Sequence, residues 1–423
     1  MSEMLKNLQL TKEEVNNLIS KFGSPLYVFH VDEFKANYTN LLNIIRDYYP
    51  NYNIAYSYKT NYTPRICKVV KELDGLAEVV SEMEFKLARK IGYDNQHIVY
   101  NGPVKGAGLF EQLLNGGVAN IDSLDEMKAV IQLAQENPKK RIRIAFRVNI
   151  DIGQGFISRF GLDAYENEDE DKESELNKAF QMAKGEENIR VVGIHCHIGR
   201  SRSIDAWKNR IRIIFALVDR YFDDNPEFID LGSGMNSVME PVLSAQFGGH
   251  IPEFCEYAEV IGNAMRKKYG HLPKSEQPML YTEPGTTLVS GCVTFLATVE
   301  TIKSVKGKVY VTFNCSGGNM GDICHLKNLP ITVFHNGNHI EKVKDASFVG
   351  YTCLEHDHMF EGFDGEIAVG DVVQFRNVGS YSNVFKPPFI LPNCAMIELD
   401  QTGKTEMIKR RETIDDIFQT YVF

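Results

Sequence analysis

The stretch NIAYSYK, residues 53–59, runs apolar and aromatic side chains into a single lysine, Lys59, and polar residues follow at once. A lone lysine at the end of a strand most often extends its ammonium group into water. Whether Lys59 has a functional role therefore depends on which residues follow the other strands of the chain. Seven more β-rich segments follow, with helical stretches between them: GLAEVVS (75–81), IVYNGP (98–103), ANIDS (119–123), IRIAFRVN (142–149), VVGIHCHIG (191–199), FIDLGSG (228–234) and LYTEPG (280–285). Eight strands alternating with helices over roughly 230 residues predict an α/β fold, a (β/α)8 TIM-like barrel. A doubly wound sheet with extra strands is the competing interpretation.

The segments between these strands carry helix signals. Ser123 is a suitable N-cap, and apolar residues recur at helical spacing from Leu124 to Ala134 until Pro138 stops the pattern. We therefore expect a helix directly after the fourth strand.

Beyond about residue 290 the pattern changes to β-rich runs such as CVTFLATVETI and EIAVGDVVQFRNVG, separated by turn residues. This pattern of β-rich runs and turns predicts an all-β domain, similar to a β-sandwich or barrel. The early strand PLYVFH (25–30) precedes the barrel and is expected to pair into that domain. The expected division is a barrel over residues 33–285 and a discontinuous β domain over residues 1–32 and 286–423.

Composition narrows the classes of function. The 423 residues are 43% hydrophobic with a formal net charge of −10, so the basic surface that binds nucleic acid or anionic membranes is not expected. The N-terminus has no basic segment followed by an apolar core, which favours a cytoplasmic protein. Eight scattered cysteines without a CxxC pair suit reduced thiols.

In parallel barrels the active site lies at the carboxyl ends of the strands. Polar residues that follow the predicted strands are therefore candidates for one shared site. They are Lys59, His197, the turn Gly232–Ser233–Gly234, and Glu283 with Gly285. A lysine, an imidazole, two glycine-bearing turns that offer backbone N–H groups to a phosphate, and a carboxylate indicate a site for an anionic, protonatable aromatic cofactor.

Six motifs then resemble, in order and spacing, the pyridoxal phosphate-dependent decarboxylases of the alanine racemase fold (fold type III), the family of diaminopimelate and ornithine decarboxylases. They are AYSYKTN, HCHIGRS, DLGSGM, TEPGTTLVSG, CLEHD and VGSY. RVNIDIG, SRFGLD, NIDSLDEM and RRETIDDI extend the resemblance over nearly the whole chain, and they look most like diaminopimelate decarboxylase.

The resemblance implies a role for each site residue. Lys59 would carry pyridoxal 5'-phosphate as an imine, His197 would stack on its ring, and Glu283 would pair with the ring nitrogen and so support a quinonoid intermediate. Gly232, Ser233, Gly234, Gly285 and Thr286 would hold the phosphate, with help from Tyr381. Cys353 would reach the active site of a second subunit and act as the proton donor.

The segments HCH (195–197) and CLEHDH (353–358) contain residue types that bind metals. His195 and His197 share one face of a strand while Cys196 points away. The ordered cofactor motifs make a metal site less favoured, so none is predicted, and His195 is interpreted as a packing residue.

The chain departs from the family where substrate is bound. Family members that act on diamino acids carry an acidic residue directly after the cysteine, where this chain has Leu354, with Glu355 one further on. Diaminopimelate decarboxylases have arginine where this chain has Thr286, and an Arg-Pro pair where it has LPITV (329–333). Because a buried charge needs a partner, diaminopimelate is not the expected substrate.

Two arginines also differ from the family pattern. Arg200 is an added cation in HIGRS, suited to a substrate carboxylate or phosphate or, equally, to a surface salt bridge. Arg159 stands where relatives have a lysine that pairs across the dimer with the aspartate matching Asp357.

The sequence therefore predicts a homodimeric, cytoplasmic decarboxylase of a small-molecule amino acid, with shared active sites and no nucleic-acid or membrane partner. An amino-acid racemase on the same fold is one alternative, although its expected tyrosine base is not evident whereas Cys353 is. A non-catalytic homologue resembling an antizyme inhibitor is the other, and the presence of Lys59, His197 and Glu283 argues against it.

Overall fold

The computed structural model describes residues 8–153, 155, 158–164, 174–336 and 339–423. The chain forms two compact units. The first contains Met1–Tyr38, Ser237–Gly249 and Thr286–Phe423, and the second contains Thr39–Asn236 and His250–Gly285. Each unit has its own sheet, and the predicted active-site lysine lies in the second.

The second unit is a closed barrel of eight parallel strands, which confirms the predicted fold class. Neighbouring strands pair in the order β2-β3-β4-β5-β6-β8-β9-β10, and β10 pairs back onto β2. All eight predicted strands are present: β2 (Tyr52–Ser57), β3 (Leu76–Val79), β4 (Ile98–Tyr100), β5 (Val118–Ile121), β6 (Ile142–Asn149), β8 (Ile189–His195), β9 (Phe228–Asp230) and β10 (Met279–Thr282). A two-residue strand, β7 (Leu162–Asp163), pairs with the end of β6 outside the ring.

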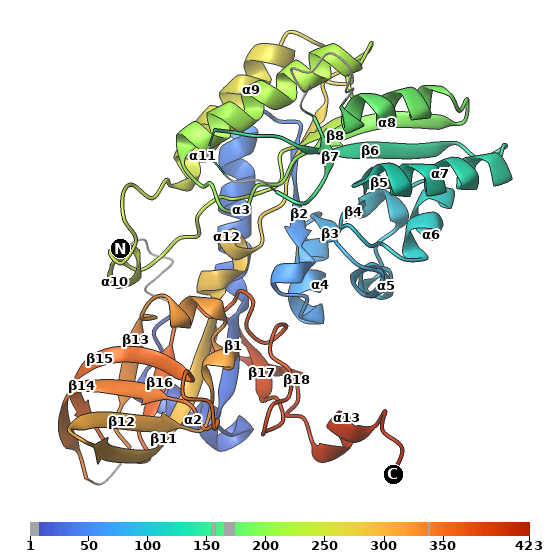
Figure 1. The fold of residues 1–423 in the computed structure, drawn as a ribbon. Helices are drawn as coiled ribbons and strands as arrows, with labels where there is room; N and C mark the ends of the chain where they lie inside the picture. The colour runs from blue at the N-terminus through green and yellow to red at the C-terminus, as the bar shows by residue number, and fades with distance from the viewer. Residues whose placement is uncertain (1–7, 154, 156–157, 165–173, 337–338) are drawn as a thin grey trace. The chain divides into compact units, whose positions relative to one another are not determined.

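Helices surround the barrel strands, and Figure 1 shows α5 to α8 lying outside them. The helix predicted after Ser123 is present, and the Ser123 side chain accepts a hydrogen bond from the main chain of Glu126. The helices are α3 (Val31–Tyr48), which begins in the first unit, α4 (Pro64–Glu72), α5 (Glu82–Ile91), α6 (Gly108–Leu114), α7 (Leu124–Glu136), α8 (Glu175–Lys184), α9 (Ile204–Tyr221) and α11 (Phe254–Tyr269).

Apolar side chains from all eight strands fill the barrel. One cluster joins Ala55, Leu76 and Val99, and a second joins Ala145, Val192 and Phe228, with Tyr281 packed against both. Gly193 makes room for the ring of Phe228, since an added Cβ would lie 2.6 Å from it. The apolar interior leaves the carboxyl ends of the strands to carry the polar residues.

The first unit contains a nine-stranded mixed sheet. The predicted early strand, β1 (Leu26–His30), lies between β11 and β17, antiparallel to the first and parallel to the second. The other strands are β11 (Val293–Val305), β12 (Lys308–Phe313), β13 (Ile331–Phe334), β14 (Glu341–Val349), β15 (His358–Ile367), β16 (Val372–Phe375), β17 (Ala395–Leu399) and β18 (Thr405–Lys409).

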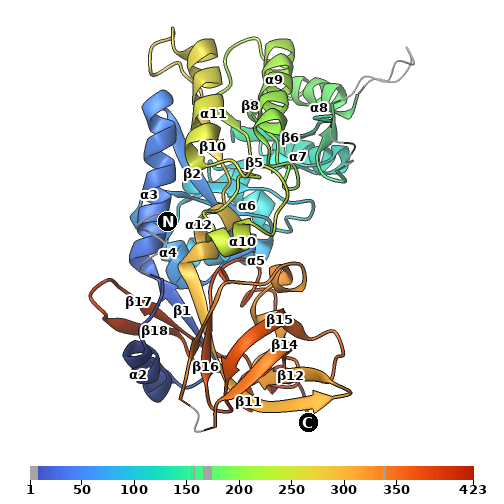
Figure 2. The same cartoon turned by 90° about the vertical axis from the view of Figure 1, so that its left-hand side faces the viewer.

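Helix α2 (Lys12–Phe22) covers part of this sheet, and Figure 2 shows it beside β1 and β18. Its apolar face carries Val15 and Leu18, which pack with Leu26, Val28 and Ile397 of the sheet. Three short helices complete the unit: α10 (Pro241–Ser244), α12 (Thr286–Val289) and α13 (Ile414–Phe418).

All eight cysteines are free in the structure. Among the residues that the structure describes, no helix combines the length and the apolar character needed to span a membrane.

Candidate active site

A pocket of about 560 Å³ opens at the carboxyl ends of the barrel strands. Its lining includes Lys59, Glu78, Asn101, His197, Arg200 and Glu283. Volumes of this size are typical of sites that enclose a small organic ligand. Lys59, His197 and Glu283, which the sequence predicted at separate strand ends, thus line one pocket.

Lys59 reaches the pocket from a short 3-10 helix, Tyr58–Thr60, that directly follows β2. Its ammonium group lies 2.5 Å from Oε2 of Glu78, which is fully buried on β3. The hydroxyl of Ser57 donates to the same carboxylate oxygen over 2.6 Å. Glu78 therefore holds the position of the amine and balances its charge.

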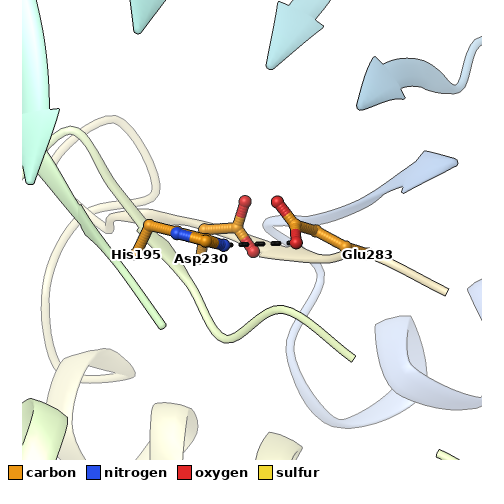
Figure 3. A group of neighbouring side chains, drawn as sticks. All are labelled: His195, Asp230 and Glu283. Carbon is orange, nitrogen blue, oxygen red and sulfur yellow. Dashed lines mark hydrogen bonds and ion pairs between the residues drawn. The ribbon is translucent and has the colours of Figure 1, made fainter. Parts of the chain in front are cut away.

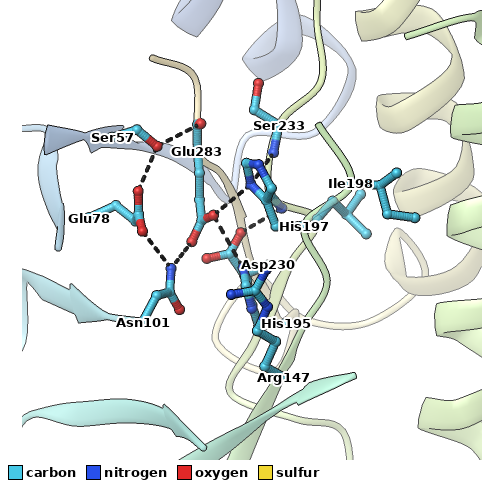
Figure 4. A network of polar contacts seen from close by, with 12 residues as sticks. Ser57, Glu78, Asn101, Arg147, His195, His197, Ile198, Asp230, Ser233 and Glu283 are labelled. Atoms are coloured by element: carbon cyan, nitrogen blue, oxygen red, sulfur yellow. Dashed lines mark hydrogen bonds and ion pairs between the residues drawn. The ribbon is translucent and has the colours of Figure 1, made fainter. Parts of the chain in front are cut away.

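Asn101 links this ion pair to Glu283. Its Nδ2 donates to Glu78 Oε1 over 2.9 Å and to Glu283 Oε1 over 2.5 Å. Its own carbonyl oxygen accepts a 2.7 Å hydrogen bond from Asn120. Figure 4 shows the resulting chain of contacts, which runs from Glu78 through Asn101 to Glu283 and the two histidines.

Glu283 follows β10 and lies between two imidazoles. Its Oε2 is 3.2 Å from Nε2 of His195 and 3.2 Å from Nδ1 of His197. Burial alone would raise the pKa of Glu283, but the imidazoles, His195 foremost, bring that pKa well below its usual range. Burial lowers the pKa of His197, against the opposing effect of Glu283. The site therefore offers an ionised carboxylate at the pocket wall.

The pKa of Asp230, at the end of β9, is shifted in the opposite direction from that of Glu283. Burial raises its pKa well above the usual range, and the charge of Glu283 raises it further. Asp230, His195 and Glu283 place ligand-type atoms within 4.8 Å of one another (Figure 3). Both oxygens of Glu283 are already used, however, by Asn101 and by the imidazoles. His195 thus positions Glu283 through a hydrogen bond, while Asp230 accepts a hydrogen bond from the Gly232 N–H.

The turn after β9 needs its glycines. Gly232 and Gly234 have φ angles of +61° and +106°, and a Cβ on Gly232 would lie 2.6 Å from the carbonyl oxygen of Cys196. The Gly232 N–H donates to Asp230 over 2.8 Å, and the Ser233 N–H lies 3.3 Å from His197 Nδ1. Gly285 packs directly against the Thr60 side chain, where a larger residue would clash.

Arg210 braces this turn from helix α9. Its fully buried guanidinium donates to the main-chain oxygens of Leu231, Ser233 and Ile198, over 2.8, 2.7 and 3.0 Å. The charged group also lies 4.2 Å from the ring of Trp207. Arg210 therefore couples the glycine turn to the segment that carries His197.

The remaining predicted residues belong to the first unit. Thr286 begins α12, while Tyr381 and Leu354 line a separate cavity of about 330 Å³. Cys353 and Glu355 are exposed beside Leu354 in the turn before β15. Asp357 anchors this turn, because its carboxylate accepts bonds from the Gly317 N–H and the Thr352 hydroxyl, over 2.7 and 2.5 Å.

Sequence reasoning missed several parts of the network. His195, interpreted as a packing residue, is instead hydrogen-bonded to Glu283. Glu78, Asn101 and Arg210 received no role, although an acidic residue inside the apolar run GLAEVVS was a detectable signal. Their contacts cross between neighbouring strands and helices, which residue spacing does not reveal.

The fold and the pocket define a barrel enzyme whose lysine and ionised carboxylate suit an aldehyde cofactor with a basic ring nitrogen. Residues 36–290, more than half of the chain, match the family model described as the pyridoxal-binding domain of pyridoxal-dependent decarboxylases, and the chain belongs to this family. It is thus a pyridoxal phosphate-dependent amino-acid decarboxylase.

Similar proteins match nearly the whole length of the chain. Diaminopimelate decarboxylase of Methanocaldococcus jannaschii is 27% identical, covering 95% of this chain and 91% of that protein. L-glutamyl-[BtrI acyl-carrier protein] decarboxylase of Niallia circulans is 26% identical, covering 98% and 97%. The crystal structure of the M. jannaschii enzyme in complex with L-lysine superposes with a TM-score of 0.82 at 26% identity, covering 96% and 94% of the two chains.

The residues present fit the cofactor. The Lys59 amine lines a pocket of adequate volume, and its side chain is 30% exposed. The carboxylate of Glu283 is kept ionised by its neighbours, as pairing with a protonated ring nitrogen requires. The His197 side chain, 22% exposed, offers a flat ring to the same space.

Proposed function

We propose that this protein decarboxylates an amino acid other than diaminopimelate, with the cofactor held at Lys59, in a homodimer with shared active sites. The continuous network from Lys59 through Glu78 and Asn101 to Glu283 is the observation that carries this proposal. Bound pyridoxal phosphate supplies the electron sink that accepts the electron pair of the broken carbon–carbon bond.

Lys59 and Glu78 act at one end of the pocket. The Lys59 nitrogen would be the nucleophile that holds the cofactor through its aldehyde. Glu78, 2.5 Å away and fully buried, stabilises positive charge on that nitrogen. Ser57 fixes the carboxylate in this position by donating to it.

Glu283 and His197 act at the other end. Glu283, kept ionised by its two imidazole neighbours, would pair with the protonated ring nitrogen of the cofactor. His197, which lines the same pocket, would pack against the cofactor ring. The turn at Gly232, Ser233 and Gly234, with Gly285 and Thr286, is assigned to the phosphate, and Tyr381 assists.

Cys353 is assigned as the proton donor to the carbon that loses carbon dioxide, acting in the site of the partner subunit. Its exposed position in a turn anchored by Asp357 supports this assignment, because a thiol that serves another subunit must be accessible and held in place. Eight free thiols are consistent with a reducing compartment, and we place the enzyme in the cytoplasm.

The residues around Cys353 argue against a diamino acid as substrate. Leu354 is 42% exposed and offers no partner to a distal ammonium group. Thr286 and the segment 329–333 provide no guanidinium for the distal carboxylate of diaminopimelate.

The test has two parts. Purified protein should show the visible absorbance of lysine-bound cofactor, and Lys59→Ala should lose it. Carbon dioxide release across a panel of amino acids that includes diaminopimelate, ornithine, lysine and arginine then identifies the reaction. Inverted stereochemistry without gas release would show a racemase and refute the proposal.

A further inference from the structure

Asp230 is a buried carboxyl group that the proposed mechanism does not use. It is the last residue of β9, it is fully buried, and Figure 3 shows its carboxyl group beside that of Glu283. Ligand-type atoms of Asp230, Glu283 and His195 lie within 4.8 Å of one another. Two carboxylates this close in a buried site repel each other, which favours a proton on one of them.

The hydrogen bonds indicate which of the two carboxyl groups carries the proton. Both oxygens of Glu283 have partners: Oε1 accepts a hydrogen bond from Asn101 over 2.5 Å, and Oε2 lies 3.2 Å from each of the two imidazoles. An ionised carboxylate, which can only accept hydrogen bonds, fits this set of partners. Glu283 is therefore the ionised member of the pair.

Asp230 has a different set of partners. Its Oδ1 accepts a hydrogen bond from the Gly232 N–H over 2.8 Å. Within the described part of the chain, no group donates a hydrogen bond to Oδ2, which is also buried. A carboxylate oxygen in this state loses its hydration without compensation, whereas an O–H group at the same position can donate to a neighbouring acceptor. These are the partners expected of a carboxylic acid whose proton is on Oδ2.

The electrostatic surroundings agree with this assignment. Burial raises the pKa of Asp230 well above its usual range, and the charge of Glu283 and a hydrogen bond with it raise that pKa further. The other titratable groups that act on Asp230 or lie beside it are Glu78, His195, Cys196 and Tyr281. Glu78 adds to the upward shift of the Asp230 pKa. Burial also raises the pKa of Cys196 and of Tyr281, so both of these groups are uncharged at neutral pH.

We propose that Asp230 is a positioning residue: as a neutral carboxylic acid it donates a hydrogen bond from Oδ2 to the carboxylate of Glu283, while its Oδ1 keeps the bond from Gly232. One side chain then holds two parts of the site, the carboxylate assigned to the cofactor ring and the glycine turn assigned to the cofactor phosphate. The positioning role rests on the function proposed for Glu283, whereas the protonation of Asp230 does not.

Asparagine at position 230 separates a neutral acid from a carboxylate. Its amide oxygen can accept from Gly232 and its NH2 group can donate to Glu283, so Asp230→Asn reproduces the hydrogen bonds of the acid. Asp230→Leu has a similar size and makes neither bond. We expect Asp230→Leu to weaken pyridoxal phosphate binding by about 10- to 100-fold, because a hydrogen bond to a charged group is lost. Asp230→Asn should recover most of that affinity.

Asp371, in the first unit, is the matched control. It is equally buried, but its oxygens accept hydrogen bonds from the main-chain N–H groups of Asn336 and Ala368 and lie beside the imidazole of His335. An amide NH2 group at this position would face donors. Asp371→Asn should therefore lower the free energy of unfolding more than Asp230→Asn does, without a change in pyridoxal phosphate affinity. Urea unfolding and cofactor titration measure the two effects.

Infrared spectroscopy of the cofactor-loaded enzyme detects the proton itself. Labelling aspartate with carbon-13 at the side-chain carboxyl shifts only the aspartate bands, so glutamates do not interfere. At pH 7 we expect the labelled enzyme to show the carbonyl band of a protonated carboxylic acid, and we expect Asp230→Asn to lack this band.

Absence of the acid band would refute the proposal, and so would an Asp230→Asn enzyme that binds the cofactor as weakly as Asp230→Leu. Full cofactor affinity in Asp230→Leu would refute the positioning role. If Asp230→Leu does not fold, the infrared band and the cofactor affinity of Asp230→Asn decide the result. Glu283→Gln tests the function proposed for Glu283 separately: unchanged cofactor affinity and carbon dioxide release would refute that function, while the infrared band would still show whether Asp230 is protonated.

Discussion

The buried guanidinium of Arg210 donates a 2.7 Å hydrogen bond to the main-chain oxygen of Ser233, in the middle of the glycine turn. Two further bonds, to Leu231 and Ile198, join the same side chain to both edges of the site. The turn therefore owes its shape to a side chain on α9 as well as to its own glycines.

Replacing Arg210 by lysine should destabilise the fold and the cofactor site together. Lysine keeps the charge but lacks the planar fork that reaches three carbonyl oxygens. We expect the free energy of unfolding to fall by about 2 to 3 kcal/mol, with a parallel loss of pyridoxal phosphate affinity. Urea unfolding and cofactor titration measure the two effects, and Arg212→Lys is the control. Unchanged cofactor affinity would show that the turn does not depend on Arg210.

Glu78→Gln removes the ionic partner of Lys59 while keeping the size of the side chain. The amide cannot balance the charge on the lysine nitrogen, so we expect kcat to fall roughly 100-fold. Steady-state carbon dioxide release measures the change, with cofactor absorbance confirming that the site is loaded. Glu72→Gln, which alters a carboxylate paired with Arg65 on α4, is the matched control. A kcat equal to that of the control would remove Glu78 from the reaction.

Cys353→Ala should leave pyridoxal phosphate bound but reduce turnover by roughly 100-fold, since the proton donor is lost. Cys255→Ala provides the control, because Cys255 is the other exposed cysteine. If both variants turn over as fast as the unmodified enzyme, another group protonates the product.

Mixing two inactive variants tests whether the sites are shared. In a homodimer with sites built from both chains, Lys59→Ala mixed with Cys353→Ala should recover about a quarter of full activity, because half of the dimers then hold one intact site. Activity that stays at the level of the separate variants would place Lys59 and Cys353 of one chain in the same site.

Glu84 gives the fold a pH dependence. Burial raises its pKa from 4.5 to about 7, and the charge of Glu78 adds to the effect. Below pH 4.5 the carboxyl is protonated in both folded and unfolded chains, and its full stabilising contribution is present. As the pH rises through 7 that contribution is lost, so its share of the unfolding free energy should decrease by about 3 kcal/mol.

Chemical unfolding at pH 5 and pH 8 measures this effect. Glu84→Gln retains an oxygen that can accept the Val80 N–H but does not titrate. The difference between the two pH values should therefore be smaller in the variant than in the unmodified protein. Equal differences would show that Glu84 does not titrate in this range.

Local patterns predicted most of the fold. Each barrel strand was visible as an apolar run, and Ser123 marked the start of a helix through a contact with Glu126 three residues away. The pairing of strand 25–30 into the nine-stranded sheet of the first unit also followed from its position before the barrel.

The candidate site was predictable only in part. Lys59, His197 and Glu283 stand at strand ends, where the barrel fold brings polar residues together. Arg210 lies within the amphipathic helix α9, and its sequence position does not distinguish it from the other polar residues of that helix. Asn101 follows β4, and its bonds to Glu78 and Glu283 exist only because closure of the ring brings β3 and β10 near it. Contacts of this kind depend on tertiary geometry, which no local pattern contains.

The position of β1 between β11 and β17 has a consequence for biosynthesis. The last barrel strand ends at Thr282, so the barrel sequence can emerge from the ribosome and fold while the rest is still being translated. Residues 26–30 instead form their parallel pairing only after residues 395–399 have been synthesised. For most of translation the earliest strand of the chain therefore has an unpaired edge, and a stalled or truncated product would leave that edge open to aggregation.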